Sequence, residues 1–308
     1  MWPFKHDDEL SKVVAGYVQL KAKNTQLQFS GILREWSKCL GRVPMNQARE
    51  IHVLKFVQEQ RERQGRHGKI TNWTLKRKLA LLGKLYETLL RQKLVKENPF
   101  PPIAETIRSD CGDHEPTELI PFDKVKELMR APSDVSPEGK RDRCFFALLF
   151  GGALRVSEVM GLQIGDLKLT DKKTLFVILR HTKSQKQQQQ SFPDWVKDPV
   201  QEYLAQRLVD GGSGKSPLFV VYRKNGTTAP LVQRQARRIF KAWCKVVGLP
   251  KTVKIHSTRA TAITKMLADG VPYREVQEFS RHASVQTVEQ YDKRRWELDE
   301  APGKNLKF

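Results

Sequence analysis

The sequence predicts a mainly α-helical protein with a small β-sheet, arranged as two domains. Apolar side chains recur at three-to-four-residue spacing in many segments, and one short β-rich run lies in the second half. A proline-rich segment separates two helical regions. The 308 residues suffice for two domains that each bury a core. We expect a helical domain at 1–110, a linker at 111–118, and an α+β domain with a C-terminal tail at 119–308.

The clearest helix of the first domain is expected within residues 71–94, where Thr71 or Asn72 is suited to cap its start. Its apolar stripe consists of Leu75, Leu79, Leu82, Tyr86 and Leu89. Basic residues interrupt this stripe and are expected to face outward. These candidates for contact with phosphate groups are Lys76, Arg77, Lys78 and Lys84.

Two more helices are expected in the first domain, within residues 29–40 and 45–64, and no strand pattern competes with them. In the second of these, the three-to-four spacing predicts an inward stripe of Ile51, Leu54 and Val57. Residues 98–122 then hold five prolines with Gly and Asp between them, which should break the helical pattern and mark the linker.

The second domain combines helices with one β-rich region. Residues 174–183 and 188–193 are expected to form a hairpin or small sheet around a polar turn. Helices are expected at 123–132, 139–162, 199–209, 231–248, 257–270 and 272–279. Gly270 should end one helix, and Pro272 suits the first turn of the next.

The charge of the chain indicates a polyanionic partner. Lys and Arg number 55 against 34 Asp and Glu, a net charge of +21, and the excess is spread over both predicted domains. No apolar run approaches the length of a membrane span, and the N-terminus has no apolar signal region, so we expect a cytoplasmic protein that is nucleoid-associated through DNA and has no membrane partner. Four cysteines without a CxxC pair fit a reducing compartment.

Several residues of the second domain form a set that could act on a phosphodiester. Tyr291 lies nine residues after His282 in "RHASVQTVEQYDKRR", and a phenol becomes a nucleophile only if a neighbour takes its proton. His256 and Arg259 would share a face near a helix N-terminus, and Arg155 and Glu158 lie three apart on another predicted helix. Arginines can stabilise the non-bridging oxygens, and a histidine can take or give a proton. No carboxylate cluster is evident for magnesium, so we expect neither metal nor cofactor.

The order of these segments resembles the tyrosine recombinase (phage integrase) family. The resemblance rests on "GGALRVSEVMGLQIGDL", a lysine in the β-rich region, "HSTRATAITKMLADG", "RHAS" and "QYDKR", and runs from about residue 119 to 295. The segment "LYETLLRQKLVKENPF" also resembles the end of the family's helical core-binding domain. The family would therefore give the first domain a DNA-binding role and the second a catalytic one.

The resemblance also implies residue roles. Arg155 would be the first catalytic arginine and Glu158 its acidic support; His256 and Arg259 would be the His-x-x-Arg pair. His282 matches a position that is His or Trp in the family, and Tyr291 matches the nucleophile. Lys183 matches the lysine that protonates the leaving oxygen, with Lys186 as the alternative; His181 is expected to be a hairpin side chain rather than catalytic.

The family's activity is site-specific recombination of double-stranded DNA through a 3′-phosphotyrosyl intermediate. Its members act as DNA-bound homotetramers, exchange strands through a Holliday junction, and in some cases require accessory DNA-bending proteins. Integration, excision, resolution and inversion all remain open as the biological role. A type IB topoisomerase is a second enzymatic interpretation. A non-catalytic helix-turn-helix regulator is a third, although it leaves Arg155, His256 and Arg259 unexplained.

Overall fold

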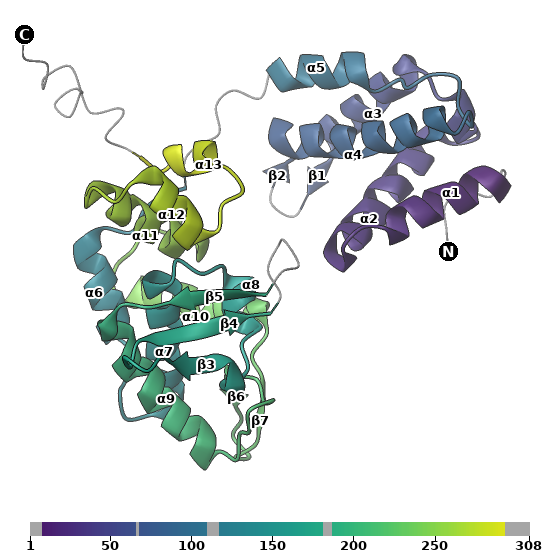
Figure 1. The fold of residues 1–308 in the computed structure, drawn as a ribbon. Helices are drawn as coiled ribbons and strands as arrows, with labels where there is room; N and C mark the ends of the chain where they lie inside the picture. Colours follow the sequence, from purple (N-terminus) through teal and green to yellow (C-terminus); the bar gives the residue numbers. More distant parts are fainter. Residues whose placement is uncertain (1–7, 66–67, 110–116, 181–186, 293–308) are drawn as a thin grey trace, which may run out of the picture. The chain divides into compact units, whose positions relative to one another are not determined.

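A computed structural model describes residues 8–65, 68–109, 117–180 and 187–292, and these form two compact units, 1–115 and 116–308 (Figure 1). Most of the predicted linker lies outside the described residues. The described part is mainly helical with small antiparallel sheets, which confirms the predicted fold class. None of its helices has both the length and the apolar composition that crossing a bilayer requires.

The first unit is helical apart from one very short hairpin. Its helices are α1 (Asp8–Gln19), α2 (Lys23–Leu40), α3 (Glu50–Glu62), α4 (Asn72–Arg91) and α5 (Pro101–Ser109), with a 3-10 turn at Met45–Gln47 and strands β1 (Gln64–Gly65) and β2 (Gly68–Lys69). The five residues of the predicted α4 stripe are buried, and the Thr71 hydroxyl accepts the backbone N–H of Thr74.

Aromatic side chains from three helices and the following loop form the centre of this core. The indole N–H of Trp36 donates to the hydroxyl of Tyr86 at 3.1 Å, and that hydroxyl donates to the Met45 carbonyl at 2.9 Å. Phe56 and Phe100 pack against the Trp36 ring edge-on. The polar atoms of the two largest rings are therefore satisfied inside the core, as burial requires.

Two sequence expectations for the first unit were wrong. Ile51 is 64% exposed and Leu54 is 48% exposed, because α3 turns Val53 and Phe56 inward instead. The prolines at 101 and 102 do not break the helical pattern; they begin α5. Proline is tolerated in a first turn because the N–H that it lacks would have no intrahelical acceptor there. The hairpin β1–β2 was also not anticipated.

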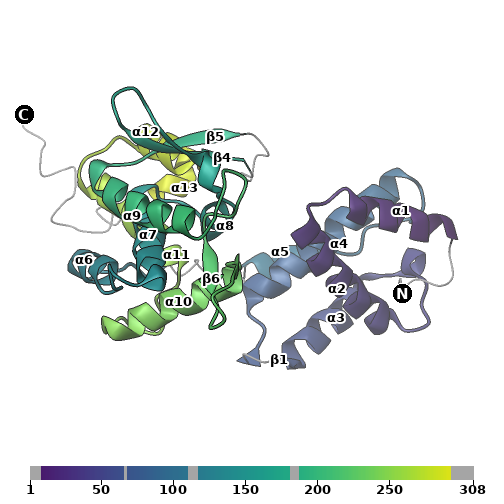
Figure 2. The ribbon, with the colours of Figure 1, turned by 90° about the horizontal axis from the view of Figure 1, so that it is seen from below.

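The second unit is built around the buried helix α7 (Pro137–Gly151). A three-stranded antiparallel sheet of order β3 (Leu167–Leu169), β4 (Leu175–Leu179) and β5 (Gln188–Ser191) lies on one side of it, and α10 (Gln233–Val246) lies on the other (Figures 1 and 2). The remaining elements are α6 (Phe122–Arg130), α8 (Val156–Met160), α9 (Lys197–Val209), α11 (His256–Ala268), α12 (Tyr273–Ser280), α13 (Val285–Glu289), the hairpin β6 (Val220–Tyr222) and β7 (Thr228–Pro230), and 3-10 turns at Ile164–Asp166 and Asp194–Val196.

The segment 139–162, expected as one helical stretch, is divided into α7 and α8. Between them, Ala153 adopts a left-handed conformation with φ of 46°. A Cβ on Gly152 would lie 2.6 Å from the Phe192 ring, so only glycine fits without displacing that ring. This break turns the chain so that α8 starts at Val156, with Arg155 as its N-cap residue. The β6–β7 hairpin was not expected, whereas the β4–β5 pairing was.

Candidate active site

The first arginine lies at the start of α8 and is held by a carboxylate one turn later. The backbone N–H of Arg155 donates to Glu158 Oε2 at 2.8 Å, and its Nη1 donates to Glu158 Oε1 at 2.8 Å. Only 2% of the Glu158 side chain is exposed, against 28% for Arg155. The predicted i, i+3 pair is therefore a buried acid that orients a partly exposed guanidinium group.

Arg259 lies one turn into α11 and is held by backbone carbonyls. Its residue exposure is 1%. Its Nη1 donates to the Ala153 carbonyl at 2.5 Å, and its Nη2 donates to the carbonyl of Ser280. Its Nε is buried without an acceptor among the described residues. Burial and the charges of Arg155 and Arg281 lower the pKa of Arg259 to about 9, which leaves it cationic at neutral pH.

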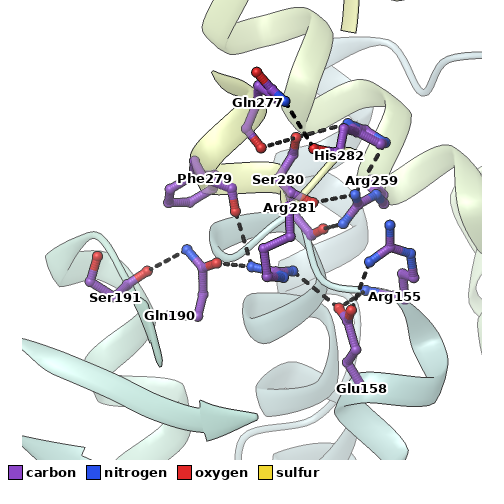
Figure 3. Close-up of polar contacts among 11 residues, drawn as sticks. Arg155, Glu158, Gln190, Ser191, Arg259, Gln277, Phe279, Ser280, Arg281 and His282 are labelled. Atoms are coloured by element: carbon purple, nitrogen blue, oxygen red, sulfur yellow. Dashed lines mark hydrogen bonds and ion pairs between the residues drawn. The ribbon is translucent and has the colours of Figure 1, made fainter. Parts of the chain in front are cut away.

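His282 lies between a serine and this arginine. Its Nε2 is 3.2 Å from Arg259 Nη2, and its Nδ1 is 2.8 Å from Ser280 Oγ (Figure 3). A guanidinium group can only donate, so Nε2 must accept and Nδ1 must carry the proton. Burial, followed by the positive charge of Arg259, lowers the pKa of His282 to about 4. The imidazole is thus a neutral Nδ1–H tautomer.

Tyr291 packs its ring on this imidazole. The two ring centroids are 5.7 Å apart with an interplanar angle of 25°. Thr264 of α11 donates its hydroxyl to the Tyr291 carbonyl at 3.1 Å, which ties the tyrosine backbone to the helix that carries Arg259. The phenol hydroxyl has no hydrogen bond to any described residue, so it is available for chemistry.

His256 is the first residue of α11 and is exposed. Local desolvation and the charges of Arg259 and Arg155 lower its pKa. The two arginine charges give the firmer reason for this direction, because the side chain remains open to solvent. His256 is therefore mostly neutral at pH 7, and its ring makes no hydrogen bond within the described part of the chain.

The site carries excess positive charge. In the described part of the site, three guanidinium groups, those of Arg155, Arg259 and Arg281, lie around the carboxylate of Glu158, and His256 and His282 are mostly neutral at pH 7. Burial opposes ionisation of Glu158, but Arg281 and Arg155 outweigh it, and the pKa of the carboxyl is lowered. Among these described groups two positive charges remain unbalanced, which suits a bound anion with several oxygens.

The structure brings together six of the seven proposed catalytic residues. Arg155 contacts Glu158, Arg259 contacts His282, and His282 contacts Tyr291. His256 lies one turn before Arg259. Lys183, with Lys186 and His181, lies outside the described residues. No cluster of three or more His, Cys, Asp or Glu side chains able to hold a metal occurs within 8–65, 68–109, 117–180 and 187–292.

Sequence reasoning missed three residues of this network: Gln190, Ser280 and Arg281. Arg281 bonds Glu158 and Gln190, and Ser280 bonds His282 (Figure 3). For Ser280 and Arg281 the one available signal was their position, since they are the two residues directly before His282. Nothing in the Gln run at 187–190 distinguished Gln190.

The four basic residues proposed on α4 differ in their surroundings. Lys78 is only 14% exposed and bonds Glu35 at 2.6 Å and Gln60 at 2.5 Å. Arg77 is exposed and bonds Gln28, and the Lys76 ammonium lies 4.3 Å from the Trp73 ring centroid. Lys84 is exposed. The expectation that all four face outward was therefore wrong for Lys78, which joins helices within the unit.

Comparison with known proteins identifies relatives of this chain. The model of the phage integrase family matches residues 118–296. The tyrosine recombinase XerC of Pelobacter propionicus is 31% identical over 215 residues, covering 70% of this chain and 67% of the relative. The XerC of Bacillus pumilus is 28% identical over 225 residues, covering 72% of this chain and 70% of the relative.

Solved structures share the fold. The Tn1549 transposon integrase in complex with circular intermediate DNA aligns with a TM-score of 0.71 at 17% identity, over 97% of this chain and 99% of the integrase chain. XerH bound to palindromic difH substrate also aligns with a TM-score of 0.71, at 15% identity, over 97% of this chain and 90% of that one. Together with the sequence matches, they establish that the chain belongs to the phage integrase family and is a tyrosine recombinase, an enzyme that cleaves and rejoins DNA.

Proposed function

We propose that the chain is a site-specific recombinase that cleaves double-stranded DNA through a 3′-phosphotyrosyl intermediate and exchanges strands through a Holliday junction. The observation that carries the proposal is the unbonded phenol of Tyr291, stacked on His282 beside the buried Arg259. A nucleophile and an excess of positive charge are thus held next to each other. An enzyme that attacks a phosphodiester needs both.

Each side chain then has a chemical role. The oxygen of Tyr291 forms a bond to phosphorus while the bond from phosphorus to the 5′-oxygen breaks. Arg155 and Arg259 stabilise the charge on the non-bridging oxygens. His256 is the histidine with free ring nitrogens, because both nitrogens of His282 are engaged, so His256 takes the phenolic proton.

The leaving 5′-oxygen receives a proton from Lys183, with Lys186 as the alternative donor. In the second half of the reaction, the 5′-hydroxyl of another strand attacks the phosphotyrosyl bond and releases Tyr291. One phosphoester replaces another in each half, so the cycle balances without ATP. Arginine charges take the electrostatic place of a metal ion.

Double-stranded DNA is the proposed partner, bound by both basic units. Lys76, Arg77 and Lys84 remain the proposed phosphate contacts of the first, core-binding unit, whereas Lys78 is already paired. The relatives named XerC and the DNA complex of XerH support recombination over topoisomerase-like relaxation. The proposal includes a homotetramer on DNA, with accessory DNA-bending proteins where the site requires them.

Covalent trapping tests the proposal. The protein is incubated with sheared DNA of its source genome, the reaction is stopped with detergent, and protein-linked fragments are sequenced. We expect attachment at 3′ ends of one recurring site, with 5′-hydroxyl ends that polynucleotide kinase labels directly. A synthetic four-way junction built from that site should be resolved into two duplexes. Relaxation of any plasmid without junction resolution would instead favour the topoisomerase reading.

A further inference from the structure

Arg281 occupies a backbone position that ordinarily favours glycine. It follows the last residue of α12 with φ of 59° and ψ of 42°, in the left-handed region. A residue with a Cβ is less favourable there than glycine. The sequence nevertheless places an arginine at this point, so the side chain is expected to have a use that compensates for the strained backbone.

The Arg281 side chain is buried and joins three elements (Figure 3). Its Nη2 donates to Glu158 Oε2 of α8 at 3.0 Å. Its Nη1 donates to the carbonyl of Phe279 at 3.0 Å and to the side-chain oxygen of Gln190. Gln190 lies opposite Val177 on the covered face of the sheet, and it is itself buried. Its bonds to Phe279 and Gln190 therefore hold the Arg281 side chain in place next to Glu158.

The carboxylate of Glu158 is shared between two arginines. Among the described residues, Oε1 accepts from Arg155 Nη1 alone, whereas Oε2 accepts from the Arg155 backbone N–H and from Arg281. A carboxylate free of other partners can chelate a guanidinium group with both oxygens. Because Arg281 and the Arg155 backbone N–H together occupy Oε2, the Arg155 side chain keeps only one bond to Glu158. Its Nε and Nη2 bond no described residue and remain available to a ligand.

Arg281 also makes the burial of Glu158 tolerable. A carboxylate that is 2% exposed must be paired to stay ionised. Arg155 alone would have to provide that pairing and would then be drawn toward Glu158. With Arg281 present, the carboxylate is satisfied from the opposite side.

We propose that Arg281 is a positioning residue for Arg155: it fixes Glu158 and thereby leaves the Arg155 guanidinium group free to stabilise a non-bridging phosphate oxygen. The inference rests on the proposed role of Arg155 at the scissile phosphate. It does not require Arg281 to contact DNA.

The test compares two DNA substrates that carry the recovered site in nicked form. One has an ordinary scissile phosphate, and the other a neutral methylphosphonate, in which a methyl group replaces a non-bridging oxygen and lowers the need for an arginine. Arg155→Ala should slow covalent attachment on phosphate roughly a hundredfold or more and much less on methylphosphonate. Arg281→Met should lose roughly ten- to a hundredfold on phosphate, because a misplacement of about 1 Å can cost a catalytic group up to about a hundredfold, and it should lose little on methylphosphonate.

Three further variants make the test specific. Arg281→Lys keeps a positive charge near Glu158 and should recover part of the rate lost on phosphate. It keeps the test informative if Arg281→Met folds poorly. The double variant Arg155→Ala/Arg281→Met should be no slower than Arg155→Ala, because both changes remove one function. Arg274→Met is the matched control, since Arg274 is an arginine of α12, the helix that Arg281 follows, and its side chain is 86% exposed.

The outcomes separate this inference from the proposed function. Equal slowing of the Arg281 variants on both substrates, while Arg155→Ala is rescued by methylphosphonate, would show that Arg281 serves the fold alone. If wild type forms no adduct, or if Arg155→Ala equals wild type on both substrates, the proposed function itself fails. Selective slowing on phosphate for both positions supports the inference.

Discussion

The imidazole of His282 lies between Arg259 and the ring of Tyr291: its Nε2 is 3.2 Å from Arg259 Nη2, and its face is stacked on the phenol ring. The tyrosine thus receives a flat, uncharged support that is itself fixed by a buried arginine. This relationship links the position of Tyr291 to α11, which carries both Arg259 and His256.

Tyr291→Phe should abolish covalent attachment and leave DNA affinity nearly unchanged. The variant keeps the ring that stacks on His282 and removes only the hydroxyl, whereas binding rests on basic side chains spread over the chain. Denaturing gels measure the adduct, and a mobility shift measures affinity. A detergent-resistant adduct formed by this variant would exclude Tyr291 as the nucleophile.

Acidification should destabilise the protein through His282. Its pKa is about 4 in the folded protein and about 6.5 when unfolded. Between these values the unfolded chain binds more protons, so stability falls as pH falls through this window and is unaffected above it. Chemical denaturation at pH 7 and pH 5 should show a smaller loss for His282→Gln than for wild type. An equal loss in both proteins would contradict the low pKa.

Cleavage should proceed at full rate in excess EDTA. Arg155, Arg259 and Arg281 supply the positive charge at the site, and the proposed mechanism uses no metal. Adduct formation is measured with and without chelator at matched ionic strength, because the affinity for DNA depends on salt concentration. Strict dependence of the chemical step on magnesium would be incompatible with this mechanism.

Lys183→Ala should lower the rate of cleavage of ordinary DNA by roughly a hundredfold or more, if general acid catalysis has its usual size. A 5′-bridging phosphorothiolate supplies a leaving group that needs little protonation and should restore much of the rate. Lys186→Ala is the matched control and should show neither effect. Rescue of Lys186→Ala alone would reverse the assignment. If sulfur rescues neither variant and both cleave ordinary DNA, His181 becomes the next candidate.

Lys78→Met should weaken the first unit without altering its DNA contacts. The change breaks the bonds to Glu35 and Gln60 and should lower the free energy of unfolding by about 1 kcal/mol. Lys84→Met should leave stability unchanged and reduce the salt dependence of DNA binding by about one phosphate contact. If Lys78→Met instead changed the salt dependence and left the unfolding midpoint unaltered, its pairing with Glu35 would not persist in solution.

Local spacing predicted the parts of the site that lie within one helical turn. The pairs Arg155–Glu158 and His256–Arg259 follow from residues three apart on a helix, although the helix start next to Arg155 was not predicted. Periodicity does not, however, show which elements meet. The contact between Glu158 and Arg281 joins residues 123 positions apart, and only tertiary packing creates it.

The same limit explains the error on α3. Ile51, Leu54 and Val57 form the predicted stripe, and of these only Val57 is buried. Val53 and Phe56 also lie at helical spacing, and the neighbouring helices decide which side chains are buried. For α5, the proline-rich composition favoured a break in the helical pattern. Proline is tolerated in the first turn of a helix, but composition alone does not show that a helix begins at Pro101. In both cases a local rule had two solutions, and long-range contacts selected one.

The acceptors that hold Arg259 are the main-chain carbonyls of Ala153 and Ser280. An amino-acid substitution replaces a side chain and leaves the carbonyl in place, so single mutations at 153 or 280 do not delete these anchors. The orientation of the Arg259 side chain therefore depends on the backbone conformation at residues 153 and 280 and not on their side chains. Sequence drift at either anchoring residue can leave that orientation unchanged.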